Sequence, residues 1–258
     1  MTVAPEATEP GTRRERQRAA TVQEIKAVAR RLLVTEGTQA LSLRAIARAM
    51  GLTAPALYRY FDGHEALVGA LVGDLYDELC DSMVVAQDEL PAEDSAADPT
   101  QLAHDAGLRL MLAACAFRTW SVGHPAEFGL VFGTPIPGVD LNDDESPACQ
   151  GGRRFGLLFA ALFLQLWAAK PFPVPDLLEL DPRLVPQIEE YRDRLGIDLP
   201  VPVVWVFLSC WARLYGLITM EVFGHLTFAL SDAEPAFMTE LAQIGCVLGL
   251  KDAVPPIT

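Results

Sequence analysis

The sequence predicts an all-α protein. Apolar residues recur at three- and four-residue steps, as in Ile25, Val28, Ala29, Leu32 and Leu33, which is the spacing of one helix face. Sustained alternation of apolar and polar residues, the mark of strands, is not visible, and neither is an internal repeat. Hydrophobic residues make up 51% of the 258 residues and charged residues 21%, so the chain can bury a sizeable core.

Charge is divided unevenly along the chain. Residues 1–64 carry ten Lys/Arg against six Asp/Glu, a net charge of +4, and residues 65–258 carry ten against twenty-eight, a net charge of −18. Phosphate would repel the acidic part, so any contact with nucleic acid should come from the first quarter of the chain.

The first quarter contains signals for four helices. Residues 1–12 are expected to be a disordered tail, followed by the basic cluster Arg13, Arg14, Arg16 and Arg18. Thr21 and Glu24 have the spacing of a capping box, so they predict the start of the first helix, and Gly37 predicts its end as a left-handed cap. Further starts are expected at Ser42, at Thr53 with Pro55 in the first turn, and at Glu65. The predicted helices are 21–36, 42–50, 54–61 and 65–85.

The remaining chain is read in the same way. Residues 88–99 and 133–152 are rich in Pro and acidic residues and predict loops. The uncharged stretches 155–169 and 199–212 are shorter than the ~20 residues of a membrane span, so they predict buried helices of a soluble, cytoplasmic protein. The predicted helices are 101–120, 125–132, 153–169, about 184–195, 203–226 and 234–250.

Cysteine usage and motifs argue against redox, metal or catalytic chemistry. The five cysteines are odd in number, widely spaced and without a CxxC pair, which indicates buried thiols in a reducing compartment. Neither a nucleophile elbow, a P-loop, a Rossmann glycine pattern nor HExxH is present, so no enzyme activity, metal or cofactor is expected.

Residues 42–61 have the pattern of a helix-turn-helix. Its second helix must stand clear of the core so that it can enter the major groove, which is about 12 Å wide. Packing between the two helices is expected from five apolar residues, namely Leu43, Ile46, Ala47, Leu52 and Leu57.

The stretch SLRAIARAMGLTAPALYRYFDGHEALVGAL, residues 42–71, resembles the DNA-binding domain of the TetR family of bacterial regulators. The resemblance implies a helix-turn-helix domain over 13–68 and a larger helical ligand-binding and dimerisation domain over 69–258. Two later stretches resemble the C-terminal "WHG" subgroup, although Tyr215 stands where that subgroup usually has His. They are His124–Gly133, with Phe128 and Leu130, and Trp211–Gly216 followed by Glu221.

The resemblance implies which residues meet DNA. Arg44 would reach a guanine or a phosphate, and Thr53 would cap the recognition helix and donate to phosphate. Three residues of the recognition helix can only touch thymine methyl groups or sense DNA shape, namely Ala54, Pro55 and Ala56. Hydrogen bonds to base edges are therefore expected from Arg44 and Arg59. The remaining expected contacts are Tyr58, Tyr60 and His64, where the family often has Lys. Arg13 to Arg18 would follow the DNA backbone or remain a solvated tail.

The C-terminal aromatic residues are read either as core or as the walls of an effector cavity. The expected cavity residues are Phe117, Trp120, Phe128, Phe159, Phe163, Trp167 and Trp211. Polar partners would be Arg118, His124 or Arg213, and Glu221 or Asp105 would serve a cation. The expected effector is mainly apolar or aromatic.

The family pairs its last two long helices into a homodimer. Gly216, Thr219 and Gly224 would permit close approach, and Leu217, Met220, Phe223 and Phe237 would fill the interface. The resulting hypothesis is a repressor of a palindromic operator, released when an effector moves helix 65–85. Two alternatives stay open: a regulator of the same fold without a small-molecule effector, including an activator, and an enzyme or carrier with an incidental helix-turn-helix.

Overall fold

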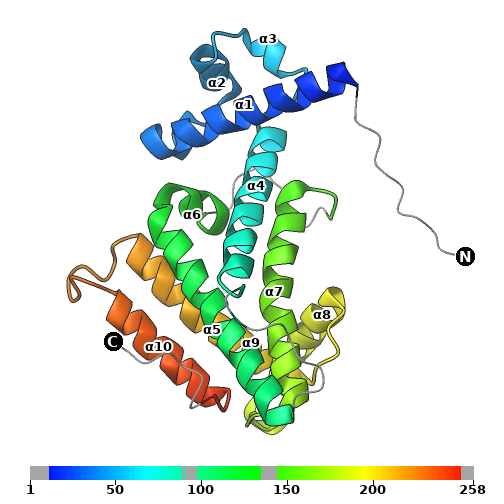
Figure 1. Ribbon diagram of the computed structural model, residues 1–258, viewed down its shortest axis with the longest axis vertical. Coiled ribbons are helices and arrows are strands. Elements are labelled where there is room, and N and C mark those ends of the chain that lie inside the picture. Colours follow the sequence, from blue (N-terminus) through cyan, green and yellow to red (C-terminus); the bar gives the residue numbers. More distant parts are fainter. Residues whose placement is uncertain (1–11, 89, 91–97, 135–143, 251–258) are drawn as a thin grey trace, which may run out of the picture. The chain divides into compact units, whose positions relative to one another are not determined.

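The computed structural model describes residues 12–88, 90, 98–134 and 144–250. These residues form ten α-helices and two short 3-10 helices, Thr38–Ala40 and Leu177–Glu179, and they contain no strand (Figure 1). The all-α prediction is therefore confirmed. The chain divides into two compact units, one within residues 1–75 and 129–150 and the other within 76–128 and 151–258. The domain boundary expected after residue 68 stays a prediction.

The first unit holds the helix-turn-helix. Its first 75 residues contain α1 (Arg13–Glu36), α2 (Leu43–Ala49), α3 (Ala54–Leu57) and the beginning of α4 (His64–Val85), and the unit also includes the end of α6 (Pro125–Phe132) and the start of α7 (Pro147–Ala169) (Figure 1). All five residues expected on the apolar face of the first helix are buried. Leu43, Ile46, Ala47 and Leu57 are buried too, whereas Leu52 is 40% exposed, so its expected packing role is wrong.

The first helix begins earlier than predicted. Thr12, not Thr21, is the N-cap: its Oγ1 accepts from the Glu15 backbone N–H, and the Glu15 carboxylate accepts from the Thr12 N–H. Thr21 lies inside α1 and its hydroxyl donates to the Gln17 carbonyl. Both Thr-x-x-Glu patterns have the spacing of a helix start. The helix begins at the upstream pattern because the arginines between the two patterns are good helix formers. Position 12 is thus part of the helix cap, while the rest of the predicted tail lies outside the described residues.

The third helix is shorter than predicted. Regular helix ends at Leu57, and Tyr58, Arg59 and Tyr60 form a turn. The Thr53 side chain makes no capping hydrogen bond, which contradicts its expected role as a cap. Gly51, with φ of 67°, takes the left-handed conformation between α2 and α3, and this is a conformation that other residues adopt only at a cost.

The second unit is built from α5 (Pro99–Gly123), α8 (Val185–Leu195), α9 (Val201–Val222) and α10 (Glu234–Val247), with parts of α4, α6 and α7. Each helix corresponds to a predicted one. Residues 89, 91–97 and 135–143 of the two predicted loops lie outside the described residues. By length and composition α9 could cross a membrane, with a mean hydropathy of 1.6 in its most apolar window, of which 33% is buried.

Helix α7 starts six residues before the predicted start. The sequence predicts that Gly151 and Gly152 belong to a loop, but they lie within the helix. A Cβ at Gly151 would lie 2.7 Å from the Cβ of Tyr76 on α4, so the absence of a side chain lets the two helices approach closely. Packing between helices therefore outweighs the low helix propensity of glycine at this position.

Candidate DNA-binding interface and effector cavity

The recognition segment, defined as Thr53–Phe61, is anchored to the core at two positions. Leu57 is fully buried and Phe61 is 8% exposed, while Tyr58 between them is 57% exposed. A buried anchor on each side of an exposed turn holds the segment against the unit and leaves its other face open. This is the arrangement that a major-groove reader requires.

Helix α2 presents Arg44 beside this segment. The Ser42 Oγ accepts from the Ala45 N–H at 3.2 Å, so Ser42 caps α2 at the helix start that the sequence predicts. Arg44, one residue into the helix, is exposed, whereas Leu43 and Ile46 point into the core.

All nine residues expected at DNA belong to the first unit, and none is buried. Arg44, Thr53, Pro55, Tyr58 and Arg59 are exposed, and Ala54, Ala56, Tyr60 and His64 are half-buried. His64 is the first residue of α4, where backbone N–H groups favour an anion.

Arg18 lies against the recognition segment, which the sequence did not predict. Its Nη1 donates to the Arg59 carbonyl at 2.8 Å, and its guanidinium carbon lies 5.4 Å from the centroid of the Tyr60 ring. The contact joins residues 41 positions apart, so a local sequence pattern does not predict it.

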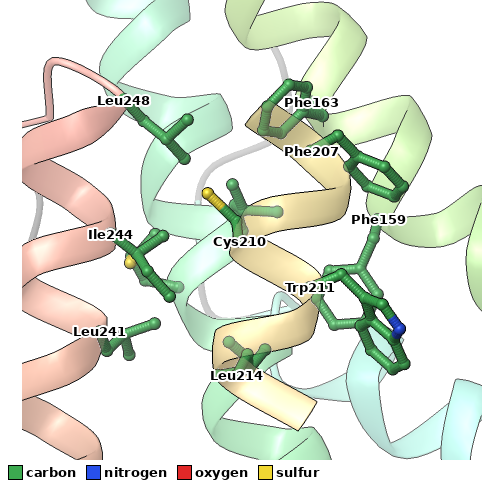
Figure 2. Close-up of a pocket in the computed structure, with 12 residues that line it drawn as sticks. Phe159, Phe163, Phe207, Cys210, Trp211, Leu214, Leu241, Ile244 and Leu248 are labelled. Carbon is green, nitrogen blue, oxygen red and sulfur yellow. The ribbon is translucent and has the colours of Figure 1, made fainter. Parts of the chain in front are cut away.

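A cavity of about 40 Å³ lies in the second unit among α5, α7, α9 and α10 (Figure 2). Of the seven residues expected around it, Phe159, Phe163 and Trp211 line it. The other lining residues are mostly aliphatic or sulfur-containing, namely Leu110, Met111, Ala114, Phe207, Cys210, Leu214, Leu241, Ile244 and Leu248. Four lining residues of α9 lie on one helix face, because they follow three- and four-residue steps: Phe207, Cys210, Trp211 and Leu214. A search for aromatic residues alone misses this helical spacing.

The other four expected residues do not line the cavity, and three of them are buried in the core. Phe117 and Phe128 are fully buried, with ring centroids 6.4 Å apart. Trp120 donates from Nε1 to the Glu78 carboxylate at 3.0 Å, and the half-buried Trp167 lies edge-on to Phe172 at 5.0 Å.

The polar groups expected beside the cavity are already paired. Arg118 donates to Glu221 at 2.6 and 2.8 Å, Arg213 donates to Glu240 at 2.5 Å, and His124 Nδ1 lies 2.9 Å from the Trp120 carbonyl oxygen. None of them lines the cavity, and its walls carry almost no polar surface.

One lining residue is ionisable. Burial raises the pKa of the Cys210 thiol to about 11, so Cys210 is a neutral, weakly reactive thiol at neutral pH. None of the described residues that line the cavity is charged at neutral pH, so burying an unpaired charge against them would cost several kcal/mol.

Two protein-family models match this chain, one near its N-terminus and one in its C-terminal part. Residues 25–71 match the family model described as bacterial regulatory proteins, tetR family, and residues 110–244 match the tetracyclin repressor-like C-terminal domain. The HTH-type transcriptional regulators Mb1846 of Mycobacterium bovis and Rv1816 of Mycobacterium tuberculosis are each 31% identical over 196 residues, which is 76% of this chain and 78% of theirs.

Solved structures give the same result. The regulatory protein SCO4313 is 31% identical and superposes with a TM-score of 0.65 over 90% of this chain and 98% of its own. A protein of unknown function from Rhodococcus sp. RHA1, 19% identical, shares the fold with a TM-score of 0.59 over 92% of this chain and 98% of its own. Together with the exposed recognition segment, these matches show that the chain belongs to the TetR family of DNA-binding bacterial transcriptional regulators.

Proposed function

We propose that the chain is a cytoplasmic, homodimeric repressor that leaves a near-palindromic operator when a small neutral, apolar molecule binds the second unit. The observation that carries the DNA-binding part is the recognition segment, in which Leu57 and Phe61 are buried while Tyr58 is 57% exposed. Arg44 and Arg59 are the proposed readers of base edges. Thr53, Tyr58, Tyr60 and His64 are the proposed phosphate contacts, and Ala54, Pro55 and Ala56 follow the groove surface.

Helix α9 supports the proposed homodimer. It is strongly apolar, yet only a third of its most apolar window is buried, and Met220 and Phe223 are 40% and 44% exposed. Gly216 on the same helix would let a second copy approach closely. Phe237 is predicted at this interface but is 1% exposed within the protomer, so it cannot fill it. A two-fold dimer would place two recognition segments about 34 Å apart, one turn of DNA.

The cavity supports an effector without charge. Drug-sized ligands need about 300–1,000 Å³, so the cavity of about 40 Å³ has to widen before such a molecule fits. The second half of α10 can supply the movement. The first half of the helix is held to α5 and α9 by ion pairs, from Arg118 to Glu234 and from Arg213 to Glu240. The second half, with Leu241 and Ile244, and Leu248 just after the end of the helix face the cavity with apolar side chains (Figure 2).

A series of aromatic contacts connects the cavity with α4. Phe159 and Trp211 line the cavity, and each has its ring centroid 5.5 Å from that of Phe155. The Phe155 centroid lies 6.0 Å from that of Tyr76 on α4. An effector that displaces Trp211 would therefore push on α4 through these contacts. To empty the operator, it has to favour the non-binding arrangement by only a few kcal/mol.

Binding to the DNA upstream of the chain's own gene, measured at fixed salt by gel shift, tests the DNA part. We expect wild type to bind and the Arg44→Ala/Tyr58→Ala double variant to bind about 100-fold more weakly. Arg183→Ala, which removes an equal charge from a side chain in the other unit, should bind like wild type. Equal binding by the double variant would show that the assigned contacts are wrong.

Thermal shift with neutral apolar compounds and their carboxylate analogues tests the effector part. We expect only the neutral series to raise Tm, and we expect Cys210→Phe, which places a large side chain in the cavity, to abolish that rise. The small cavity also favours the alternative of a regulator without a small-molecule effector. A Tm unaffected by every compound, with DNA binding intact, would support that alternative.

A further inference from the structure

Arg18 contacts the last two residues of the turn in the recognition segment, Arg59 and Tyr60. Its Nη1 holds the Arg59 carbonyl oxygen at 2.8 Å, and its guanidinium lies over the ring of Tyr60, with 5.4 Å between the guanidinium carbon and the ring centroid. Both partners follow α3 directly. Arg18 therefore bridges from α1 to the part of the segment that regular helix does not reach.

The turn needs such a contact because its backbone is only partly fixed. In a helix each carbonyl accepts from an N–H four residues on, but regular helix ends at Leu57. The Tyr60 and Phe61 N–H groups both donate to the same carbonyl, that of Leu57. Arg18 supplies a donor to the Arg59 carbonyl, and a cation at the C-terminal end of a helical segment is also favoured by the helix dipole.

We propose that Arg18 is a positioning residue for DNA recognition, which holds the turn so that the Arg59 side chain points toward the base edges. The inference rests on the proposed role of Arg59 as a base reader. In the structure the guanidinium of Arg18 is directed to protein partners. Its effect on DNA binding should therefore pass through the turn and not through a phosphate.

A positioning residue and a phosphate contact have different signatures. A phosphate contact releases a counterion, so its loss weakens binding to every duplex alike and lowers the dependence of log K on log[salt] by about 0.9 for each phosphate. A residue that only orients the base-reading turn affects the operator and leaves binding to unrelated duplex and the salt dependence nearly unchanged.

The test compares Arg18→Gln with Arg31→Gln by fluorescence anisotropy, on an operator selected by wild type from a random duplex pool and on an unrelated duplex. Arg31 is a matched control, because it is exposed and lies thirteen residues further along α1, a helical rotation of about 220° away from Arg18. Titrations between about 50 and 200 mM salt give the slope. Circular dichroism and Tm report folding.

We expect Arg18→Gln to bind the operator about tenfold more weakly, since a net hydrogen bond changes an equilibrium by about two- to tenfold and a dimer has two copies. Binding to the unrelated duplex and the salt slope should remain as in wild type, and Arg31→Gln should change neither. Arg18→Lys should restore only part of the affinity, because an ammonium keeps the charge but lacks the planar group that lies on Tyr60. It also provides the comparison should Arg18→Gln unfold.

Two results would overturn the inference while the proposed function stands. An equal loss on both duplexes with a lower slope would make Arg18 a phosphate contact, and an unchanged operator affinity would show that its contacts have no role in recognition. If wild type bound no duplex even at low salt, the proposed function would fail and this inference with it. Wild-type binding with an unaffected Arg18→Gln variant would overturn this inference alone.

Discussion

Removing Arg118 should destabilise the second unit strongly. Arg118 on α5 donates two hydrogen bonds to Glu221 on α9, at 2.6 and 2.8 Å, and one to Glu234 on α10, at 3.2 Å. Burial acts to lower the pKa of Arg118, but the bonds to Glu221 and Glu234 outweigh it and raise the pKa. Arg118 thus stays charged and connects three helices around one point.

The size of the effect follows from exposure. The side chains of Arg118 and Glu221 are 12% and 13% exposed, so Arg118→Met leaves a buried carboxylate without its partner, at a cost of about 3–5 kcal/mol. Glu234 is 63% exposed, and its ion pair is screened by water and contributes at most ~1 kcal/mol. The cost should appear as a fall in Tm of about 10 °C.

Urea unfolding followed by circular dichroism at one fixed protomer concentration measures this change, since the proposed dimerisation would make stability depend on concentration. The double variant Arg118→Met/Glu221→Leu is the control: with both charges gone, most of the stability should return. Glu234→Gln alone should cost little. A loss below ~1 kcal/mol in Arg118→Met, or a double variant no more stable than the single one, would refute the reasoning.

Other predictions concern close packing and the buried thiol. Gly151→Leu should cost about 1–3 kcal/mol, because its Cβ would meet Tyr76 at 2.7 Å, whereas Gly156→Ala on the same helix, with nothing within 4 Å, should gain up to ~1 kcal/mol; urea unfolding compares them. A thiol reagent at about pH 8 should modify the exposed Cys246 well before Cys210, whose pKa is raised by burial, and equal rates measured by mass spectrometry would contradict this. The folded state holds the Cys210 proton more tightly than the unfolded chain, so its contribution to stability is complete below pH 9.0 and is lost as the pH rises toward about 11. Unfolding midpoints measured across this range should fall less steeply in Cys210→Ala.

Local signals predicted the helices well and failed where two of them conflicted. Ser42 and Gly51 marked the limits of α2 as expected. Thr12 and Thr21 begin the same Thr-x-x-Glu pattern, and only the folded chain shows that the first of them starts α1. Gly151 belongs to a stretch that the sequence predicts as a loop, but it lies within α7, where the absence of a side chain lets Tyr76 approach closely.

The candidate sites were predictable to different degrees. The recognition segment is contiguous in sequence, so its buried and exposed residues follow from helical spacing and the family pattern. The cavity is assembled from four helices, and Phe117 and Phe159 look alike in the sequence. Phe117 is packed in the core, and Phe159 borders the cavity.

By itself the sequence determined the helical class, the basic first quarter and the likeness to TetR regulators, because helix periodicity, charge and a contiguous motif are properties of neighbouring residues. Tertiary structure alone decided that Arg18 holds the recognition turn and that Arg118 is paired with Glu221. It also decided which side chains surround the cavity. These pairings join residues 41 and 103 positions apart, and they depend on how helix faces pack against one another in three dimensions.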